Sequence, residues 1–201
     1  MKHLNNFITE KLIINKNSKQ KQVYNYHPKT IDELKELVNK LIKERGNDAN
    51  LNDIDTSEIT DMSVLFQKSE FNGDISKWNV SNVKDMYKMF KDSKFNGDIF
   101  NWNVNNVNGM YKMFYNSEFN SNISKWNVSN VSDMSDMFKK SKFNGDISNW
   151  DVSNVKYMSG MFKYSDFNGD ISNWDVSNVK VMDHIIDNCP LEKNPPKWYK
   201  K

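Results

Sequence analysis

Acidic residues recur at a fixed interval along the chain, and they are the first candidates for chemistry. Asp74, Asp98, Asp146 and Asp170 are spaced by multiples of 24 residues, with Asn122 at the one missing place. A file of carboxylates could bind calcium, but that ion takes six or more oxygen ligands and each interval here offers one carboxylate. We therefore expect these aspartates to accept backbone hydrogen bonds at a turn, and we predict no metal site and no cofactor.

Groups for nucleophilic or acid-base catalysis are few and scattered. The histidines are His3, His27 and His184, and the single cysteine is Cys189, which excludes both an intramolecular disulfide and a cysteine-based zinc site. An enzyme gathers an acid, a base or a nucleophile in one pocket. No motif here does so, and we predict a protein that is not an enzyme and has no catalytic residues.

Charge and composition limit the classes of partner that we expect the chain to bind. The 201 residues include 28 Lys and Arg against 26 Asp and Glu, a net charge of +2, which lacks the concentrated basic character of a nucleic-acid-binding surface. No apolar run reaches the length of a membrane-spanning helix, so we expect no membrane insertion. The aromatic content of 13% indicates an ordered core rather than a disordered chain.

A repeat of 24 residues dominates the sequence. The near-copied unit reads FNGDISxW(N/D)VSNVxxMxxMFxxSx, and five full units start at residues 71, 95, 119, 143 and 167. One unit cannot bury its large apolar side chains alone, so stacked units must share them. We predict that equivalent residues form interior columns, namely Trp78, Trp102, Trp126, Trp150 and Trp174 with Met86, Met110, Met134 and Met158.

Each unit combines two periodicities. Trp78 and Val80 alternate as in a strand, whereas Val83, Met86 and Met89 follow the spacing of one helical face. The predicted fold is an α/β repeat solenoid of leucine-rich-repeat-like stacked coils, each with a short parallel strand and a short helical turn. The Asn-Gly pairs are expected to provide a corner with positive φ, and the Ser-Asn pairs to cap the helical turns.

The repeats lie between two end segments. Residues 1–50 form an N-terminal segment with a capping helix over about 30–45, marked by the capping box of Thr30 and Glu33. Residues 51–190 form the solenoid, starting with a partial coil, and residues 191–201 form a C-terminal cap and tail. We expect the helix to pack on residues 51–66. Residues 1–28 either complete this cap or dock on a partner or a second copy of the chain.

One unit carries a family resemblance. FNGDISNWDVSNV followed by MSGMF, within residues 143–162, closely resembles the BspA-type leucine-rich-repeat surface proteins, which include repeats of mycoplasma lipoproteins and of other bacterial surface proteins. The similarity spans about residues 51–190 and implies a surface-attached, non-enzymatic scaffold for adhesion and protein contact. The repeats and helical cap are also similar to those encoded by gut Bacteroides-type bacteria and their phages.

The cellular location is predicted from the first residues of the sequence. They include neither a signal peptide nor a lipobox cysteine. A cytoplasmic or virion-associated protein is therefore expected, and display on the cell surface is implied only by the resemblance.

Aromatic residues that differ between units are the candidate contact surface. Recurring residues build the scaffold, whereas varying ones are free to contact a partner, and tyrosine is enriched at interfaces. The candidates are Tyr87, Phe100, Tyr111, Tyr115, Tyr157 and Tyr164. A partner face and a mere covering of the solenoid wall explain them equally well. We predict a protein-binding scaffold. The alternative is a structural or self-assembling component, phage- or virion-associated, that uses the N-terminal segment or the coil ends.

Overall fold

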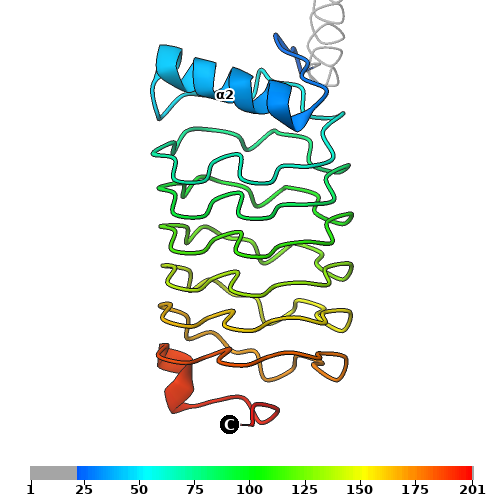
Figure 1. Ribbon diagram of the computed structural model, residues 1–201, viewed down its shortest axis with the longest axis vertical. Helices are drawn as coiled ribbons and strands as arrows, with labels where there is room; N and C mark the ends of the chain where they lie inside the picture. The colour runs from blue at the N-terminus through cyan, green and yellow to red at the C-terminus, as the bar shows by residue number, and fades with distance from the viewer. Residues whose placement is uncertain (1–21, 201) are drawn as a thin grey trace, which may run out of the picture.

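The computed structural model describes residues 22–200, in which successive windings of 24 residues lie one above another (Figure 1). The regular elements in this range are helix α2, Ile31–Arg45, at one end of the stack and the 3-10 helix η1, Pro190–Lys193, at the other. Parallel β-bridges join windings at single points. The longest file of bridges runs through Asp61, Asp85, Gly109, Asp133, Tyr157 and Val181.

Helix α2 covers the first winding. The Thr30 side chain accepts a hydrogen bond from the Glu33 N–H, the Glu33 carboxylate accepts one from the Lys29 N–H, and Gly46 ends the helix with a φ of 91°. Its buried residues Leu34, Val38 and Leu41 form one apolar stripe. The helix lies across the end of the stack (Figure 1), where the first winding would otherwise expose its core.

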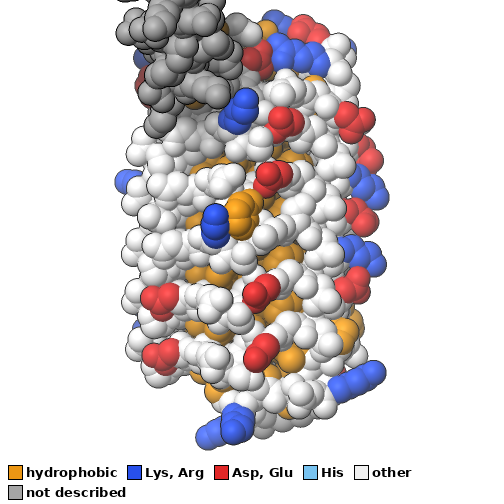
Figure 2. Space-filling view, turned by 180° about the vertical axis from the view of Figure 1, so that it is seen from behind, with side chains coloured by type: hydrophobic (Ala, Val, Ile, Leu, Met, Phe, Trp, Pro, Cys, Tyr) orange, Lys and Arg blue, Asp and Glu red, His pale blue; other side chains and the backbone are white. Residues whose placement is uncertain are grey.

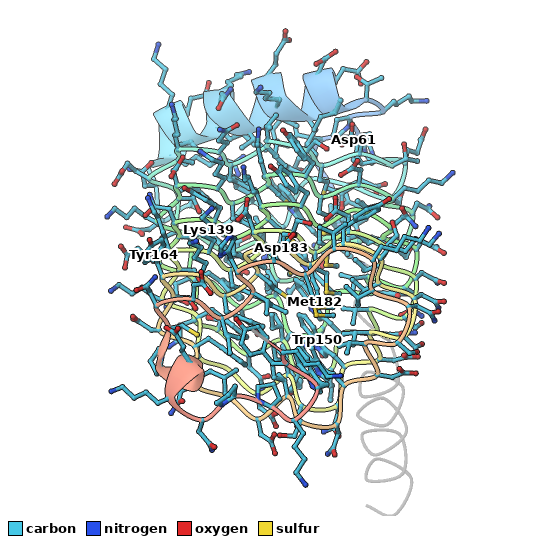
Figure 3. The ribbon with its side chains drawn as sticks, turned by 60° about the horizontal axis from the view of Figure 1, so that its bottom comes forward. Asp61, Lys139, Trp150, Tyr164, Met182 and Asp183 are labelled. Carbon is cyan, nitrogen blue, oxygen red and sulfur yellow. The ribbon has the colours of Figure 1, made fainter. Side chains whose placement is uncertain are left out.

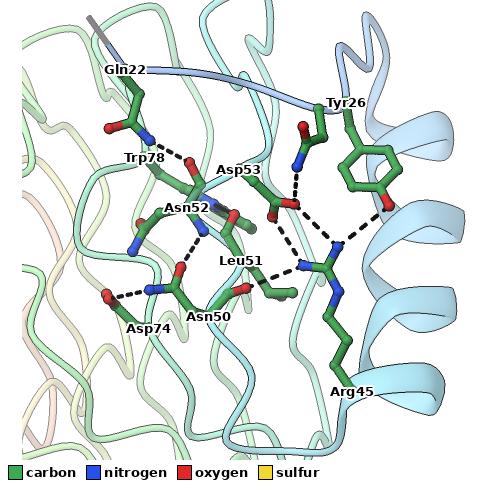
Figure 4. Close-up of polar contacts among 10 residues, drawn as sticks. Gln22, Tyr26, Arg45, Asn50, Leu51, Asn52, Asp53, Asp74 and Trp78 are labelled. Atoms are coloured by element: carbon green, nitrogen blue, oxygen red, sulfur yellow. Dashed lines mark hydrogen bonds and ion pairs between the residues drawn. The ribbon is translucent and has the colours of Figure 1, made fainter. Parts of the chain in front are cut away.

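Residues before α2 also pair with the first winding. Tyr26 forms a parallel bridge with Ile54, and the Arg45 guanidinium holds the Asp53 carboxylate at 3.0 and 3.1 Å while donating to the Tyr26 hydroxyl (Figure 4). The hydrogen bond from Arg45 lowers the pKa of Asp53, against the opposing effect of burial. The described part of the N-terminal segment therefore contributes to the cap, and residues 1–21 lie outside the described residues.

The interior is a set of aromatic and methionine columns. The five repeat tryptophans are only 3–4% exposed, and the methionines beside them are fully buried. Each indole N–H donates to a backbone carbonyl 27 residues earlier, as Trp126 does to Ile99 at 3.0 Å. Phenylalanine rings of adjacent windings stack, with Phe90 and Phe114 5.5 Å apart and nearly parallel. The indoles thus fill the core and also satisfy buried carbonyls.

Along one wall of the stack, alternate residues form a ladder of backbone hydrogen bonds that all have the same donor-to-acceptor direction. Met62, Val64 and Phe66 donate their N–H groups to the carbonyls of Asp85, Tyr87 and Met89, and equivalent bonds of 2.8 to 3.1 Å recur at each later winding. Every such N–H points toward the C-terminal end and every such carbonyl toward the N-terminal end. This arrangement needs linked turns in which alternate peptide groups rotate, and it places residues such as Val64 and Lys68 at positive φ.

Two predictions about this part of each coil are wrong. The segment predicted as a helical turn is a run of tight turns instead, because alternate N–H groups bond to the next winding and those between them bond to the carbonyl three residues earlier. The positive φ falls on this wall and not on the Asn-Gly corners. Gly73 and Gly97 instead leave room for a ring, since a Cβ atom on either would come within 2.8 Å of the ring of Phe71 or Phe95, although Ser121 stands at the equivalent place in the next winding.

Polar side chains brace the corners of the windings. Asp74 and Asp146 each accept a hydrogen bond from the backbone N–H two residues later, and Asn122 makes the same bond with its amide oxygen. The Ser-Asn pairs do not cap helical turns. Instead, the side-chain amide of such a pair, as in Asn154, donates to the carbonyl of Ser129 in the winding before, at 2.7 Å. None of the helices in residues 22–200 has the length and apolar character needed to cross a membrane.

Truncating a central indole tests the stacked core. We expect Trp126→Ala to lower the free energy of unfolding by about 3 to 5 kcal/mol through lost burial and a residual cavity. Trp198 continues the same column at the end of the stack, where it is only partly buried, so Trp198→Ala is the matched control with a smaller loss. Urea unfolding measures both. Equal losses would contradict an interior that is best packed at the centre.

Relief of backbone strain tests the turn geometry. Val64 has a φ of 57°, which is costly for a β-branched residue, so Val64→Asn should raise the free energy of unfolding by about 1 kcal/mol. Gly160 occupies the same column with a φ of 62°, and a Cβ there would lie 2.5 Å from Asp136 Oδ1. Gly160→Ala should therefore destabilise the protein. Thermal unfolding distinguishes these outcomes, and a less stable Asn variant would argue against the turn.

Acid should weaken the corners. Backbone and side-chain hydrogen bonds from the serine two residues later lower the pKa of Asp146, Asp151, Asp170 and Asp175. A carboxylate whose pKa is lower when folded adds stability above its ordinary pKa of about 3.9, and this stability is lost as pH falls through the folded value. Urea midpoints should therefore drop below about pH 4.

A quadruple change of these aspartates to asparagine is the control. Asn122 and Asn127 already make the equivalent bonds in another winding, so the variant should keep its stability at pH 7 and lose less on acidification. An acid loss as large as that of the unchanged chain would assign the effect to other groups.

Candidate protein-binding site

Tyr87 and Tyr111 form a stacked pair on the outside of the hydrogen-bonded wall. Their ring centroids are 5.4 Å apart and the planes differ by 11°. The neighbouring Met86 and Met110 point into the core and are fully buried, so the next residue of each winding faces outward. Both tyrosines are half-buried. The 24-residue period therefore turns two distant tyrosines into one continuous aromatic surface.

A shallow groove runs beside this pair. Its lining consists of Tyr87 and Tyr111 together with Asp85, Gly109 and Asp133, and its volume is about 310 Å³. The three lining residues other than tyrosine belong to one file of bridges, with Gly109 between the two aspartates. Gly109 keeps the groove open, because a Cβ atom there would lie 3.2 Å from Asp85 Oδ1.

The two carboxylates are held in place and remain available. Asp85 Oδ1 accepts a hydrogen bond from the Tyr87 N–H at 2.8 Å, and Asp133 Oδ1 accepts one from the Ser135 N–H at the same distance. Neither Oδ2 has a partner among residues 22–200. Each carboxylate can therefore accept hydrogen bonds from a bound group without rearranging.

Lysines cover the tyrosine faces. Lys88 Nζ lies 4.4 Å from the centroid of the Tyr87 ring, and Lys112 Nζ lies 4.7 Å from that of Tyr111 and 3.4 Å from Asp136 Oδ2. Burial alone would lower the pKa of Lys112, but its hydrogen bond to Tyr111 and the nearby Asp136 raise it. Lys112 therefore stays charged and fixed beside the pair.

The predicted aromatic residues are only partly brought together. Tyr115 joins the pair through Lys112, whose Nζ lies 5.6 Å from its ring, and Tyr157 is bridged to Asp133 at the edge of the groove. Tyr164 is 51% exposed and contacts Lys163 further along. Phe100 contacts Lys125 at 4.4 Å and touches none of these tyrosines, so the six do not form one surface.

Sequence reasoning missed the polar half of the groove. Asp85, Gly109 and Asp133 belong to a file whose members vary as much as the tyrosines do, and that variation was the available signal. Their meeting with Tyr87 and Tyr111 depends on the register between windings, which no local pattern reveals.

The aspartates first considered as calcium ligands each have one carboxylate oxygen hydrogen-bonded to the backbone. Acidic side chains form a vertical file on the back of the stack (Figure 2). Asp146 and Asp170 each use one oxygen for a backbone N–H at 2.9 Å. In the part of the chain that the structure describes, no group of three or more His, Cys, Asp or Glu side chains could hold a metal ion.

Comparison with known proteins gives a family but no activity. No curated protein matches the chain, and no solved structure does. The family described as Mycoplasma protein of unknown function, DUF285, matches residues 32–142 and 116–198, which together cover most of the chain and nearly all of its windings. The protein therefore belongs to the DUF285 family of repeat proteins.

Proposed function

We propose that this chain is a non-enzymatic scaffold that binds a protein partner through the groove beside Tyr87 and Tyr111. The observation that carries the proposal is the stacked pair, half-buried and flanked by Asp85 and Asp133, each with one unused oxygen. Aromatic rings next to oriented hydrogen-bond acceptors are typical of the centres of protein interfaces. A partner side chain that carries N–H donors would lie over Gly109, between the carboxylates.

The surroundings of the cysteine and of two of the histidines are compatible with a binding role. Cys189 is buried, burial raises the pKa of its thiol, and its sulfur donates to the Ile186 carbonyl at 3.1 Å. His27 and His184 lie against Asp55 and Asp187 at separate ends of the stack. The groove is also near the lower limit of volume for a small-molecule pocket, which favours a protein side chain as its occupant.

We further propose that the stacked windings are a leucine-rich-repeat-like solenoid of the BspA type. Support comes from the repeated unit, the parallel bridges at 24-residue intervals and the match to the DUF285 family. Adhesion would be one use of such a scaffold. The cellular location stays a prediction from the sequence.

A structural, self-assembling component remains the second candidate. The observation in its favour is the last winding, where Val176, Val179 and Met182 are only partly buried, whereas Val152, Val155 and Met158 one winding earlier are 0–1% exposed. Apolar surface left at the end of a stack is a natural place for another chain to attach.

Removing the aromatic pair tests the binding proposal. The chain is immobilised and used to capture partners from extracts of its native cell. We expect Tyr87→Ser combined with Tyr111→Ser to reduce capture of the principal species at least tenfold, because the pair supplies the central contact area. Phe100→Ser is the matched control, since Phe100 contacts Lys125 and not the pair. Urea midpoints confirm folding, and undiminished capture by the double variant would remove this groove as the binding site.

A further inference from the structure

The file of bridges ends at Val181 without a next partner. Three backbone hydrogen bonds surround the bridge between Tyr157 and Val181. In the first, the Lys156 carbonyl accepts from the Lys180 N–H. In the other two, the N–H groups of Met158 and Gly160 donate to the carbonyls of Val181 and Asp183. These bonds measure 2.9 to 3.0 Å. Around this bridge, each internal winding therefore presents one acceptor and two donors to the winding below it, and further donors follow along the wall.

In the last winding the three equivalent backbone groups are not hydrogen-bonded. Among residues 22–200, the Lys180 carbonyl and the N–H groups of Met182 and His184 have no hydrogen-bond partner. Val181 is 39% exposed, and a hollow of about 400 Å³ next to it is lined by Met182, Asp183 and Tyr199 among others. Figure 3 turns this end of the stack forward and labels Met182 and Asp183 on the last winding.

The chain covers the rest of its last winding itself. The Trp198 indole donates to the Ile171 carbonyl at 2.9 Å, and the Asn188 N–H donates to the Glu192 carboxylate at 2.8 Å. The side chain of Ile186 is fully buried. The open edge is therefore centred on residues 180–184, with known donors and acceptors, and it continues to the N–H of Ile186, which has no partner among residues 22–200.

Hydrogen-bond polarity decides what can cover this edge. Two C-terminal ends placed together would leave N–H donors without acceptors, because each edge has more free N–H groups than free carbonyls. The opposite end of a second copy, where ladder carbonyls face outward, lies under helix α2 (Figure 1). A second copy of this chain therefore matches the hydrogen-bonding groups of this edge less well than an extended segment with free carbonyls, which continues the stacking that every internal winding shows.

We propose that residues 180–184 bind an extended segment of a partner protein by parallel strand addition. One N–H of the segment donates to the Lys180 carbonyl. Two of its carbonyls, two residues apart, accept from Met182 and His184. An apolar side chain of the segment covers the half-buried Val179 and Met182. This surface is separate from the tyrosine groove and does not depend on it.

The probe is a synthetic peptide with the sequence of residues 154–163. Inside the stack this segment already supplies the required groups to the winding above, from Lys156 N–H and the carbonyls of Tyr157 and Ser159. Amide hydrogen exchange of the full chain is followed with and without the peptide. We expect the amides of Met182 and His184 to exchange at least about tenfold more slowly with peptide, and the amides outside residues 180–186 to be unchanged. No slowing at millimolar peptide would overturn the proposal.

Two comparisons keep the test specific. A peptide N-methylated at the position of Lys156 cannot donate to the Lys180 carbonyl and should not protect these amides, whereas N-methylation at the position of Lys163 should have no effect. In the free, dilute chain, Met182 and His184 should exchange much faster than Met158 and Gly160, whose N–H groups are bonded. Equal protection without peptide, or protection that rises with the concentration of the chain alone, would contradict a partner segment as the occupant.

Discussion

Contact between neighbouring windings is the interaction on which the whole molecule depends. Between α2 and η1 no winding contains a helix, and the windings touch at isolated bridges rather than along extended strands. Backbone N–H groups and indole N–H groups find their acceptors about one winding away. A single winding would leave these groups and its rings exposed, so stability is a sum of interfaces between neighbours.

That dependence makes the two ends of the stack chemically different. Because the wall ladder has one direction, its carbonyls face the N-terminal end and its N–H groups face the C-terminal end. Helix α2 and the Arg45–Asp53 ion pair close the first end. At the second end the tail replaces only part of a winding, through Trp198 and Glu192, and the edge at Met182 and His184 stays open.

The same stacking leaves the outer surface free to vary. Inward positions are occupied by Trp, Met and Phe in nearly every winding, whereas outward positions change from copy to copy without disturbing the core. Tyr87 and Tyr111 use two such positions, and the period stacks them at 5.4 Å. A regular scaffold therefore carries outward residues that differ between windings. The proposed binding site lies where these residues are aromatic and acidic.

The sequence by itself determined the period, the residues that face inward and the helix that begins after Thr30, because each follows from local spacing and capping. Only the tertiary structure decided that the Met-containing segments form turns rather than helical turns, that positive φ falls at Val64 and not at Gly73, and that Asp85 and Asp133 flank the tyrosines. The reason is physical: hydrogen bonds to a neighbour about one winding away outweigh the local preference of each segment, and they set the register that brings distant residues together.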